Sequence, residues 1–225
     1  MSDSTNKNKR HAGKEAITYI KQDTVIGLGS GSTVNLMLKE LHTETQKGLN
    51  ISGIPTSLKT EKLAHDLKIP LTNFENAAAI DLAIDGADLV DPNLNLIKGG
   101  GGSLLREKVV AAAAKRLIII VDSSKTVAQF EHVTVPVEIV PFAQIPVAEQ
   151  IKKMGAKPVL RKNGDTVFAS DNHNYILDCE FPIIQDPARM HASLKALVGV
   201  VETGIFARMA DAVIIADEDG IQIKP

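Results

Sequence analysis

Aromatic residues are scarce in this sequence of 225 residues: they make up 4% of it, and tryptophan is absent. Proteins that hold single-stranded nucleic acid usually stack its bases on aromatic side chains, so this scarcity disfavours such a platform. Charge of one sign is not in excess either, because the formal net charge is −2. A nucleic-acid binder usually shows a basic face. We therefore expect no nucleic-acid partner.

Cysteine and long apolar runs are also nearly missing. The single cysteine, Cys179, excludes an internal disulfide and is compatible with a reducing compartment. Because no histidine or basic cluster lies near Cys179 in sequence, we interpret it as an apolar filler of a strand. No apolar run reaches the roughly 20 residues that span a bilayer, and MSDSTNKNKR at the N-terminus lacks the apolar segment of a signal peptide. We expect a cytoplasmic protein with no membrane partner.

Several catalytic motifs are absent as well. The six histidines show no paired spacing and no HExxH, and neither GxSxG nor GxxxxGK[ST] occurs. Zinc hydrolysis, acyl hydrolysis and P-loop chemistry are therefore disfavoured. Residues 27–31 superficially resemble a dinucleotide fingerprint, but the third glycine is misplaced and no acidic residue closes the next strand. We expect neither a metal nor a cofactor.

Short apolar runs alternate with helical patterns in the first half of the chain. Strands are predicted at 24–28, 51–55, 70–72, 79–84 and 117–121, a first helix at 11–20, and a returning strand and hairpin at 212–216 and 220–224. Near-continuous apolar strands that alternate with helices predict an α/β domain with a Rossmann-like parallel sheet. Ligands of such sheets bind beyond the carboxyl ends of the strands.

The pattern changes near residue 131. A strand and a helix are predicted at 133–140 and 145–154, strands that include a hairpin at 157–162, 166–169 and 174–179, and a helix and a last strand at 186–196 and 198–203. This order is typical of a smaller α+β domain of the ferredoxin-like kind. We therefore expect an α/β catalytic domain at residues 1–130 plus 205–225 and a small α+β domain at residues 131–204.

Residues Gly29 to Thr33 follow the first predicted strand and open a helix. The N–H groups of a helix N-terminus and its dipole make an anion site, to which hydroxyls add donors. A plain helix cap is the alternative. Two glycines and three hydroxyls in five residues exceed what a cap needs, so the segment predicts an anion site.

The stretch 81–107 is the most unusual part of the sequence. It contains Asp85, Asp88 and Asp91, then a run of four glycines after Lys98, and then Glu107 at the start of an alanine-rich helix. Four consecutive glycines carry the largest backbone entropy cost of any composition. The run therefore predicts a close approach to the backbone or a turn that side chains forbid. Asp91 precedes a proline and is interpreted as a turn residue.

A carboxylate beside a lysine suits proton transfer next to a carbonyl group. Glu107 would remove the proton, while Lys98 and N–H groups of the glycine run would stabilise the charge on the oxygen. Asp85 and Asp88 would hold sugar hydroxyls or move protons during ring opening. Each residue also has a structural explanation: turns and caps for the aspartates, the helix dipole for Glu107, and solvated surface for Lys98 and Lys125.

Four motifs, in their order and separation, resemble the type A ribose-5-phosphate isomerase family. They are GLGSGST (27–33), DGADLVD (85–91), IKGGGGSLLREK (97–108) and DSSK (122–125), and the resemblance continues in PVEIVPFA (136–143) and ILD (176–178). The glycine-run motif is the most specific of them. The resemblance implies interconversion of ribose 5-phosphate and ribulose 5-phosphate through an ene-diol, without metal or cofactor, in a homodimer or higher oligomer.

The resemblance also implies residue roles. Glu107 matches the proton-shuttling base, Asp85 the residue that assists ring opening, and Lys98 the electrostatic stabiliser. The implied substrate-binding set is Ser30, Gly31, Ser32, Thr33, Asp85, Gly86, Ala87, Asp88, Lys98, Gly99, Gly100, Gly101 and Lys125. Lys9 aligns with an N-terminal phosphate lysine. Leu89 replaces a usual acidic residue, and Ser30 a frequent threonine; we expect little effect on the chemistry from either.

Two alternative functions stay open at this point. A non-catalytic sugar-phosphate sensor would need a DNA-binding module before the first strand, for which about 20 residues are too few. A related acyl or CoA transferase would use a glutamate as covalent nucleophile, so that an acyl-enzyme could be trapped. The motifs favour the isomerase, with a phosphorylated sugar as its partner.

Overall fold

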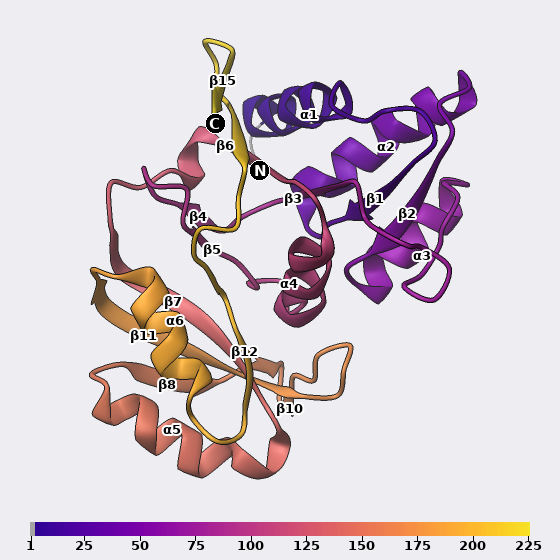
Figure 1. Cartoon of the computed structure of the whole chain (residues 1–225). Helices are drawn as coiled ribbons and strands as arrows, with labels where there is room; N and C mark the ends of the chain where they lie inside the picture. The colour runs from indigo at the N-terminus through magenta and orange to yellow at the C-terminus, as the bar shows by residue number, and fades with distance from the viewer. Residues whose placement is uncertain (1–2) are drawn as a thin grey trace. The chain divides into compact units, whose positions relative to one another are not determined.

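The computed structural model describes residues 3–225, and Figure 1 traces their helices and strands. The chain forms two compact units. The first contains the residues up to 87 together with 106–126 and 209–225, and the second contains 88–105 and 127–208. The domain bounds expected from the sequence stay a prediction, which limited proteolysis would test. Within residues 3–225, no helix combines the length and the apolar character needed to cross a membrane.

The first unit is built on a six-stranded sheet in the order β15-β14-β6-β3-β1-β2. Its strands are β1 (Thr24–Leu28), β2 (Ile51–Pro55), β3 (Leu82–Asp85), β6 (Leu117–Asp122), β14 (Ala212–Ala216) and β15 (Ile221–Lys224). All neighbours pair in parallel except β15, which is antiparallel to β14. The predicted Rossmann-like sheet and the return of the C-terminal segment to it are confirmed.

Some bounds in this unit differ from the prediction. The strand expected at 79–84 begins only at Leu82, because the Asp81 carboxylate accepts the N–H of Val25 at 3.1 Å and thereby interrupts the ladder. The strand expected at 70–72 is reduced to a single bridge between Gly53 and Leu71. The first helix, expected from His11, begins already at Asp3.

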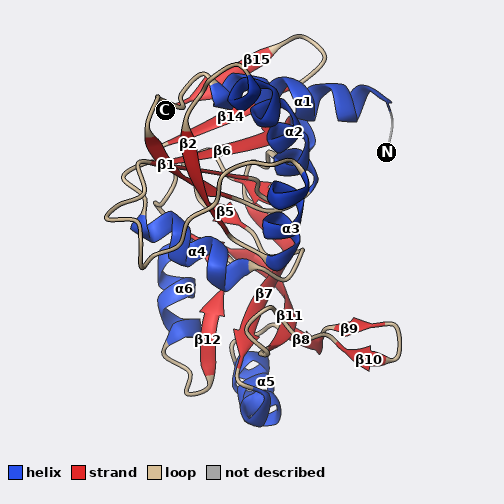
Figure 2. Ribbon diagram, turned by 90° about the vertical axis from the view of Figure 1, so that its right-hand side faces the viewer, coloured by secondary structure: helices blue, strands red, loops and turns tan. Residues whose placement is uncertain are grey.

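Helices cover both faces of the six-stranded sheet. Figure 2 shows α1 (Asp3–Ile17), α2 (Ser32–Gln46) and α3 (Leu58–Asp66) along one face. Side chains alternate between the faces of a strand, so Ile26 and Leu28 of β1 are buried on this side. The residue between them, Gly27, faces α4 (Leu104–Ala113), where an added Cβ would lie 2.4 Å from Cγ1 of Val110. Helix α4 therefore packs closely against β1.

The second unit contains a four-stranded antiparallel sheet in the order β12-β7-β11-β8. Its elements are β7 (Phe130–Ile139), α5 (Gln144–Lys153), β8 (Lys157–Leu160), β11 (Tyr175–Ile184), α6 (Pro187–Lys195) and β12 (Val200–Thr203). The chain order and strand order are those of a ferredoxin-like fold, as predicted. Val135, Val137 and Cys179 share its core with Val147 of α5 and Leu194 of α6.

Smaller elements of the second unit surround the glycine run. Strands β13 (Ile205–Phe206), β5 (Leu96–Ile97) and β4 (Leu89–Val90) form a three-stranded sheet, and β9 (Lys162–Asn163) and β10 (Thr166–Val167) form a hairpin. Pro136 and Asp178 are opposite each other on β7 and β11 and point away from the helices, since Val135 and Cys179 point toward them. The chain at Lys98 lies on this helix-free face, because a Cβ added to Gly204 would meet both Lys98 and Pro136.

Candidate active site

Hydroxyl groups fix the turn between β1 and α2. The Ser30 hydroxyl lies 2.7 Å from that of Thr56, 3.0 Å from that of Ser57 and 3.2 Å from that of Thr60. The Thr60 hydroxyl also donates to the carbonyl oxygen of Gly29 at 2.8 Å. Ser30 therefore ties the turn to the start of α3. That Ser30 binds the substrate stays a prediction.

Asp85 ends β3 beside that turn. Its side chain is buried, and Oδ1 accepts the N–H of Ser30 at 2.9 Å and that of Gly86 at 2.7 Å. A Cβ added to Gly29 would lie 2.2 Å from the same oxygen, so only glycine lets the two strands' ends approach this closely. The structure thus brings together three residues that the sequence assigned to the site: Ser30, Asp85 and Gly86. Ala87 follows directly and is half-buried.

The anion site predicted from the sequence falls at the N-terminus of α2, and its binding of an anion stays a prediction. Gly31 precedes the helix with φ 99° and, as a glycine, caps none of the first N–H groups with a side chain of its own. Ser32 is exposed, Thr33 is half-buried, and the buried Lys9 donates from Nζ to the Ser32 hydroxyl at 3.0 Å. A lysine ammonium and a helix N-terminus in one place favour an anion.

Lys125 lies at the end of β6, in the short 3₁₀ helix η1 (Ser123–Lys125). The Asp122 carboxylate caps this helix by accepting the N–H and the hydroxyl of Ser124. Lys125 is half-buried. Because β6 and β3 are adjacent and parallel, Asp85 and Lys125 lie at the carboxyl ends of neighbouring strands.

Glu107 lies in the first turn of α4, where a carboxylate is favoured by the helix dipole. Its side chain is only 5% exposed. Helix α4 is held against β1 through Val110, one turn further along. Glu107 is therefore a buried carboxylate on a rigid element, which its role as dipole complement alone would not require.

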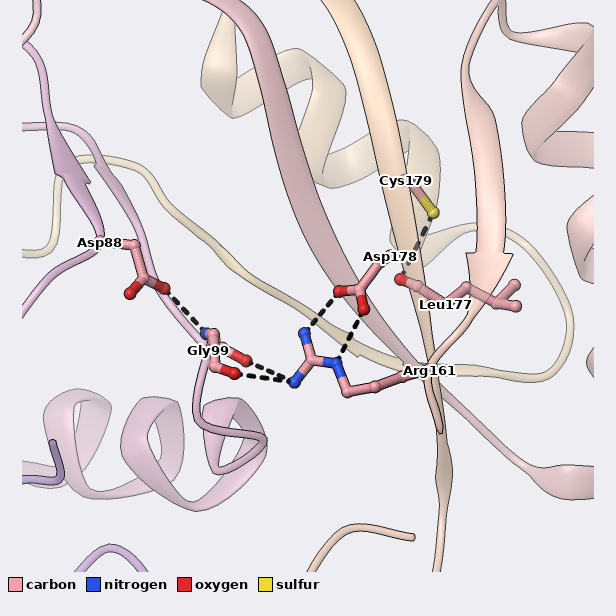
Figure 3. Close-up of polar contacts among 7 residues, drawn as sticks. Asp88, Gly99, Arg161, Leu177, Asp178 and Cys179 are labelled. Carbon is pink, nitrogen blue, oxygen red and sulfur yellow. Dashed lines mark hydrogen bonds and ion pairs between the residues drawn. The ribbon is translucent and has the colours of Figure 1, made fainter. Parts of the chain in front are cut away.

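The second unit contains the remaining predicted residues. Lys98 is 3% exposed, its Nζ lies 5.4 Å from the ring centroid of Phe206, and its N–H donates to Gly204 at 2.8 Å. A desolvated ammonium above a ring face gains cation–π attraction. Asp88 Oδ2 accepts the N–H of Gly100 at 2.8 Å (Figure 3). Asp88 thus touches the glycine run directly.

At three glycines of the run, a different neighbour leaves no room for a side chain. A Cβ would lie 2.8 Å from Leu104 at Gly99, 3.0 Å from the Asp88 carboxylate at Gly100, and 2.4 Å from the Phe168 ring at Gly102. Gly99 and Gly102 also have φ values of 95° and 88°, which favour glycine. Around Gly101 no atom of residues 3–225 lies within 4 Å of such a Cβ. The predicted close approach to the backbone is thus confirmed for three glycines, and Gly101 is the open one.

An arginine that contacts the run and the aspartate paired with it were not predicted as site residues. Arg161 donates to the carbonyl oxygens of Gly99 and Gly100 and pairs with Asp178 (Figure 3). Asp178 belongs to the ILD motif, which was noted without a role. Arg161 stands beside Lys162 next to a hairpin turn, where a basic residue is ordinarily solvated, so no local signal distinguishes it.

Two other sequence interpretations, those of Asp91 and Cys179, are tested by contacts in the described chain. Asp91 forms a turn, because its carboxylate accepts the N–H groups of Asn93 and Asn95 at 2.9 and 2.8 Å. Cys179 is fully buried in β11, as expected of a strand filler, and burial raises the pKa of its thiol. Across residues 3–225, no three side chains among His, Cys, Asp and Glu are grouped so as to hold a metal ion.

A family model described as ribose 5-phosphate isomerase A (phosphoriboisomerase A) matches residues 52–220. The chain belongs to the ribose 5-phosphate isomerase A family. Ribose-5-phosphate isomerase A 1 of Oceanobacillus iheyensis is 46% identical over 219 residues, which are 97% of this chain and 98% of the relative. The family resemblance inferred from the four motifs is confirmed.

Solved structures agree with this assignment. A D-ribose-5-phosphate isomerase in complex with phospho-erythronic acid matches with TM-score 0.96 and 39% identity, covering 100% of this chain and 99% of the other. The ribose 5-phosphate isomerase A of Methanocaldococcus jannaschii matches with TM-score 0.94 and 35% identity, covering 98% and 99%. The chain is therefore an aldose–ketose isomerase of the ribose 5-phosphate isomerase A family, and the sensor and transferase alternatives gain no support.

Proposed function

We propose that Glu107 moves the proton between C2 and C1 as the chain interconverts ribose 5-phosphate and ribulose 5-phosphate through an ene-diol. Membership of the family is the observation that carries this function. The position of Glu107 supports its role, because the carboxylate is 5% exposed and lies on a helix packed against β1. A general base works best when its position is fixed and water is kept away.

Removal of the C2 proton of the aldose places negative charge on the carbonyl oxygen at C1. Lys98 stabilises this charge together with N–H groups of the glycine run. The burial of Lys98 supports this assignment, since an ammonium acts more strongly where water is excluded. Asp88 holds a substrate hydroxyl, a role supported by its bond to Gly100 in the same loop.

Asp85 assists the opening of the sugar ring, which needs a proton to pass from the anomeric hydroxyl to the ring oxygen. Its support is the pair of N–H groups, from Ser30 and Gly86, that fix one carboxylate oxygen. A carboxylate with one oxygen held by hydrogen bonds keeps its other oxygen in one orientation. Ser30, Gly86 and Ala87 then bind substrate around it.

The phosphate binds at the N-terminus of α2. Gly31, Ser32 and Thr33 supply the helix N-terminus, and the ammonium of Lys9 lies beside Ser32. Lys125 adds a second cation from the end of β6. The relative solved with phospho-erythronic acid binds a phosphorylated sugar acid, and we expect the same compound to compete with ribose 5-phosphate here.

The experiment that tests this function is incubation with ribose 5-phosphate in deuterated water. We expect ribulose 5-phosphate to form and solvent deuterium to enter at the carbon that receives the proton. Failure to form the ketose would contradict the activity. Formation without any deuterium would leave the activity but contradict a base that exchanges its proton with solvent.

The variant Glu107→Gln tests the base itself. It keeps the size of the side chain and removes its basicity, so we expect kcat to fall by about 10² to 10⁴ while phosphosugar binding is kept. Glu61→Gln, in the first turn of α3, is a matched control on another helix, and we expect it to keep activity. Full activity of Glu107→Gln would refute the assigned role.

We also propose that the chain forms a homodimer through an apolar surface of the second unit. Phe142 and Val198 are 98% and 95% exposed, and Ile145 is 66% exposed. These residues belong together, because Val140 donates its N–H to the carbonyl of Gly199 at 3.0 Å. Large apolar side chains gathered on a surface mark an interface. Phe142→Asp should give monomers in sedimentation velocity, and a monomeric unmodified protein would contradict the proposal.

The cytoplasm is the proposed location. Ribose 5-phosphate carries a charged phosphate that does not cross a bilayer unaided, so the enzyme must share a compartment with the pathways that make its substrate. Cell fractionation with activity measurement tests this, and activity found only outside the cytoplasm would contradict it.

A further inference from the structure

An arginine–aspartate pair of the second unit holds the glycine run by its carbonyl groups. Nη1 of Arg161 donates to the oxygen of Gly99 at 3.0 Å and to that of Gly100 at 3.2 Å. Nε and Nη2 of the same guanidinium donate to the two oxygens of Asp178 at 2.9 and 2.5 Å (Figure 3). One planar group therefore joins two acceptors of the loop to a carboxylate of the sheet.

The guanidinium stands on a rigid base. Strand β8 ends one residue before Arg161, and the N–H of Arg161 donates to Ile176 of β11 at 2.9 Å. Its carbonyl accepts the N–H of Phe168 at 3.0 Å. Asp178 lies on β11, within the four-stranded sheet. Both members of the pair are thus fixed by the backbone of the sheet, and Arg161 is only 13% exposed.

The same group reaches the far end of the run through an aromatic ring. The guanidinium carbon of Arg161 lies 5.7 Å from the centroid of the Phe168 ring, and that ring occupies the place where Gly102 would carry a Cβ. Gly99, Gly100 and Gly102 are therefore held from the sheet. The only glycine of the four with open space is Gly101.

We infer that Arg161 and Asp178 are positioning residues for the catalytic loop. Four glycines in succession have very many backbone conformations, and the pair selects one by fixing two of the carbonyls. That conformation directs the N–H of Gly100 to Asp88 and sets the chain direction immediately after Lys98. This inference rests on the proposed function for the roles of Asp88 and Lys98.

Arginine suits this position for a geometric reason. Its five N–H donors lie in one plane, so it can bind a carboxylate with one edge and two carbonyls with another. Lysine has a compact ammonium and cannot reproduce both edges. Arg161→Lys therefore keeps the charge and most of the apolar stem but loses the planar set of donors. The variant thus distinguishes an effect of positioning from an effect of charge.

The test compares Arg161→Lys, Arg161→Ala and Asp178→Asn with Arg189→Lys, a control on the exposed surface of α6. We expect kcat for ribose 5-phosphate to fall by about 10² in the first three, since a displacement near 1 Å costs about this much, and KM to change less. The control should match the unmodified protein. Guanidinium ion at millimolar concentration should restore part of the rate of Arg161→Ala, while methylammonium should not.

Hydrogen exchange of the peptide that covers residues 98–103 is a second readout that needs no activity. We expect faster exchange there in Arg161→Lys and Asp178→Asn, with unchanged exchange in β1 and β2. Unchanged kcat and unchanged exchange in Arg161→Lys would refute the inference. An unmodified protein that is inactive on ribose 5-phosphate would instead refute the proposed function, and the exchange result would still decide whether the pair positions the loop.

Discussion

Replacing Gly29 with alanine should displace Asp85. The added Cβ would lie 2.2 Å from Oδ1, 2.4 Å from Cγ and 2.6 Å from Cα of Asp85, whereas ordinary contacts begin at 3.4 Å. A shift of the side chain alone does not relieve the contact with Cα. The strands are also joined there, because Gly29 donates its N–H to Ile84 at 2.9 Å. The variant must therefore separate the ends of β1 and β3 or turn the Asp85 carboxylate away.

The expected magnitudes follow from this geometry. Relief of the contact with Oδ1 needs a movement of at least 3.4 − 2.2 = 1.2 Å. Overpacking that forces the backbone to move costs about 1–3 kcal/mol, and a catalytic group misplaced by about 1 Å loses about 10² in rate. Gly29→Ala should therefore lower the free energy of unfolding by that amount and kcat by about two orders of magnitude.

The assay pairs urea unfolding with steady-state kinetics on ribose 5-phosphate. Gly48→Ala is the matched control, because Gly48 also belongs to the first unit but has open space around its Cβ position. Because Gly48 has a positive φ of 106°, Gly48→Ala should lower the free energy of unfolding but leave kcat unchanged. If Gly29→Ala kept both the stability and the kcat of the unmodified protein, the close packing of β1 against Asp85 would be refuted.

Two further predictions concern ionisation. The ammonium of Lys115, followed by the N–H of Val25, holds the pKa of the Asp81 carboxyl below its usual range, so its stabilisation is present above about pH 4 and is lost as the pH falls through the lowered value. Asp81→Asn should cost at most about 1 kcal/mol in urea unfolding at pH 7, and a cost that does not shrink below pH 4 would contradict this. Burial, with Asp178 as a second cause, raises the pKa of the Cys179 thiol. Iodoacetamide at pH 8 should therefore label the native protein far more slowly than the protein in urea, and equal rates would contradict the burial.

The sequence predicts the fold well because its signals are local. Apolar runs such as Leu117–Val121 fill a strand that is buried on both faces, and β6 contains all of these residues. The predicted strand bounds are wrong where a single side chain interrupts an apolar run. Asp81 interrupts its strand by binding the N–H of Val25, a residue 56 positions away that no local pattern reveals.

The candidate site is predicted in part for the same reason. Asp85 is the last residue of a buried strand, so the rule on strand ends finds it. Arg161 binds carbonyls 61 and 62 residues away, and its own neighbours in sequence are those of a surface hairpin. Arg161 contacts the glycine run only because the fold brings the end of β8 against it. The residue types around Arg161 in the sequence therefore do not indicate a site residue.

The glycine run combines both kinds of information. Its composition shows that side chains are excluded, but each exclusion has a different cause outside the run: Asp88 at Gly100, Phe168 at Gly102 and Leu104 at Gly99. Substitutions at these three glycines would disturb the fold of the loop, ahead of any effect on substrate binding. Gly101 lacks both a close neighbour and a positive φ. Gly101→Ala should therefore keep its stability in urea and raise KM for ribose 5-phosphate, because the methyl group would occupy the side open to the sugar. An unchanged KM would show that the sugar does not approach the run at this glycine.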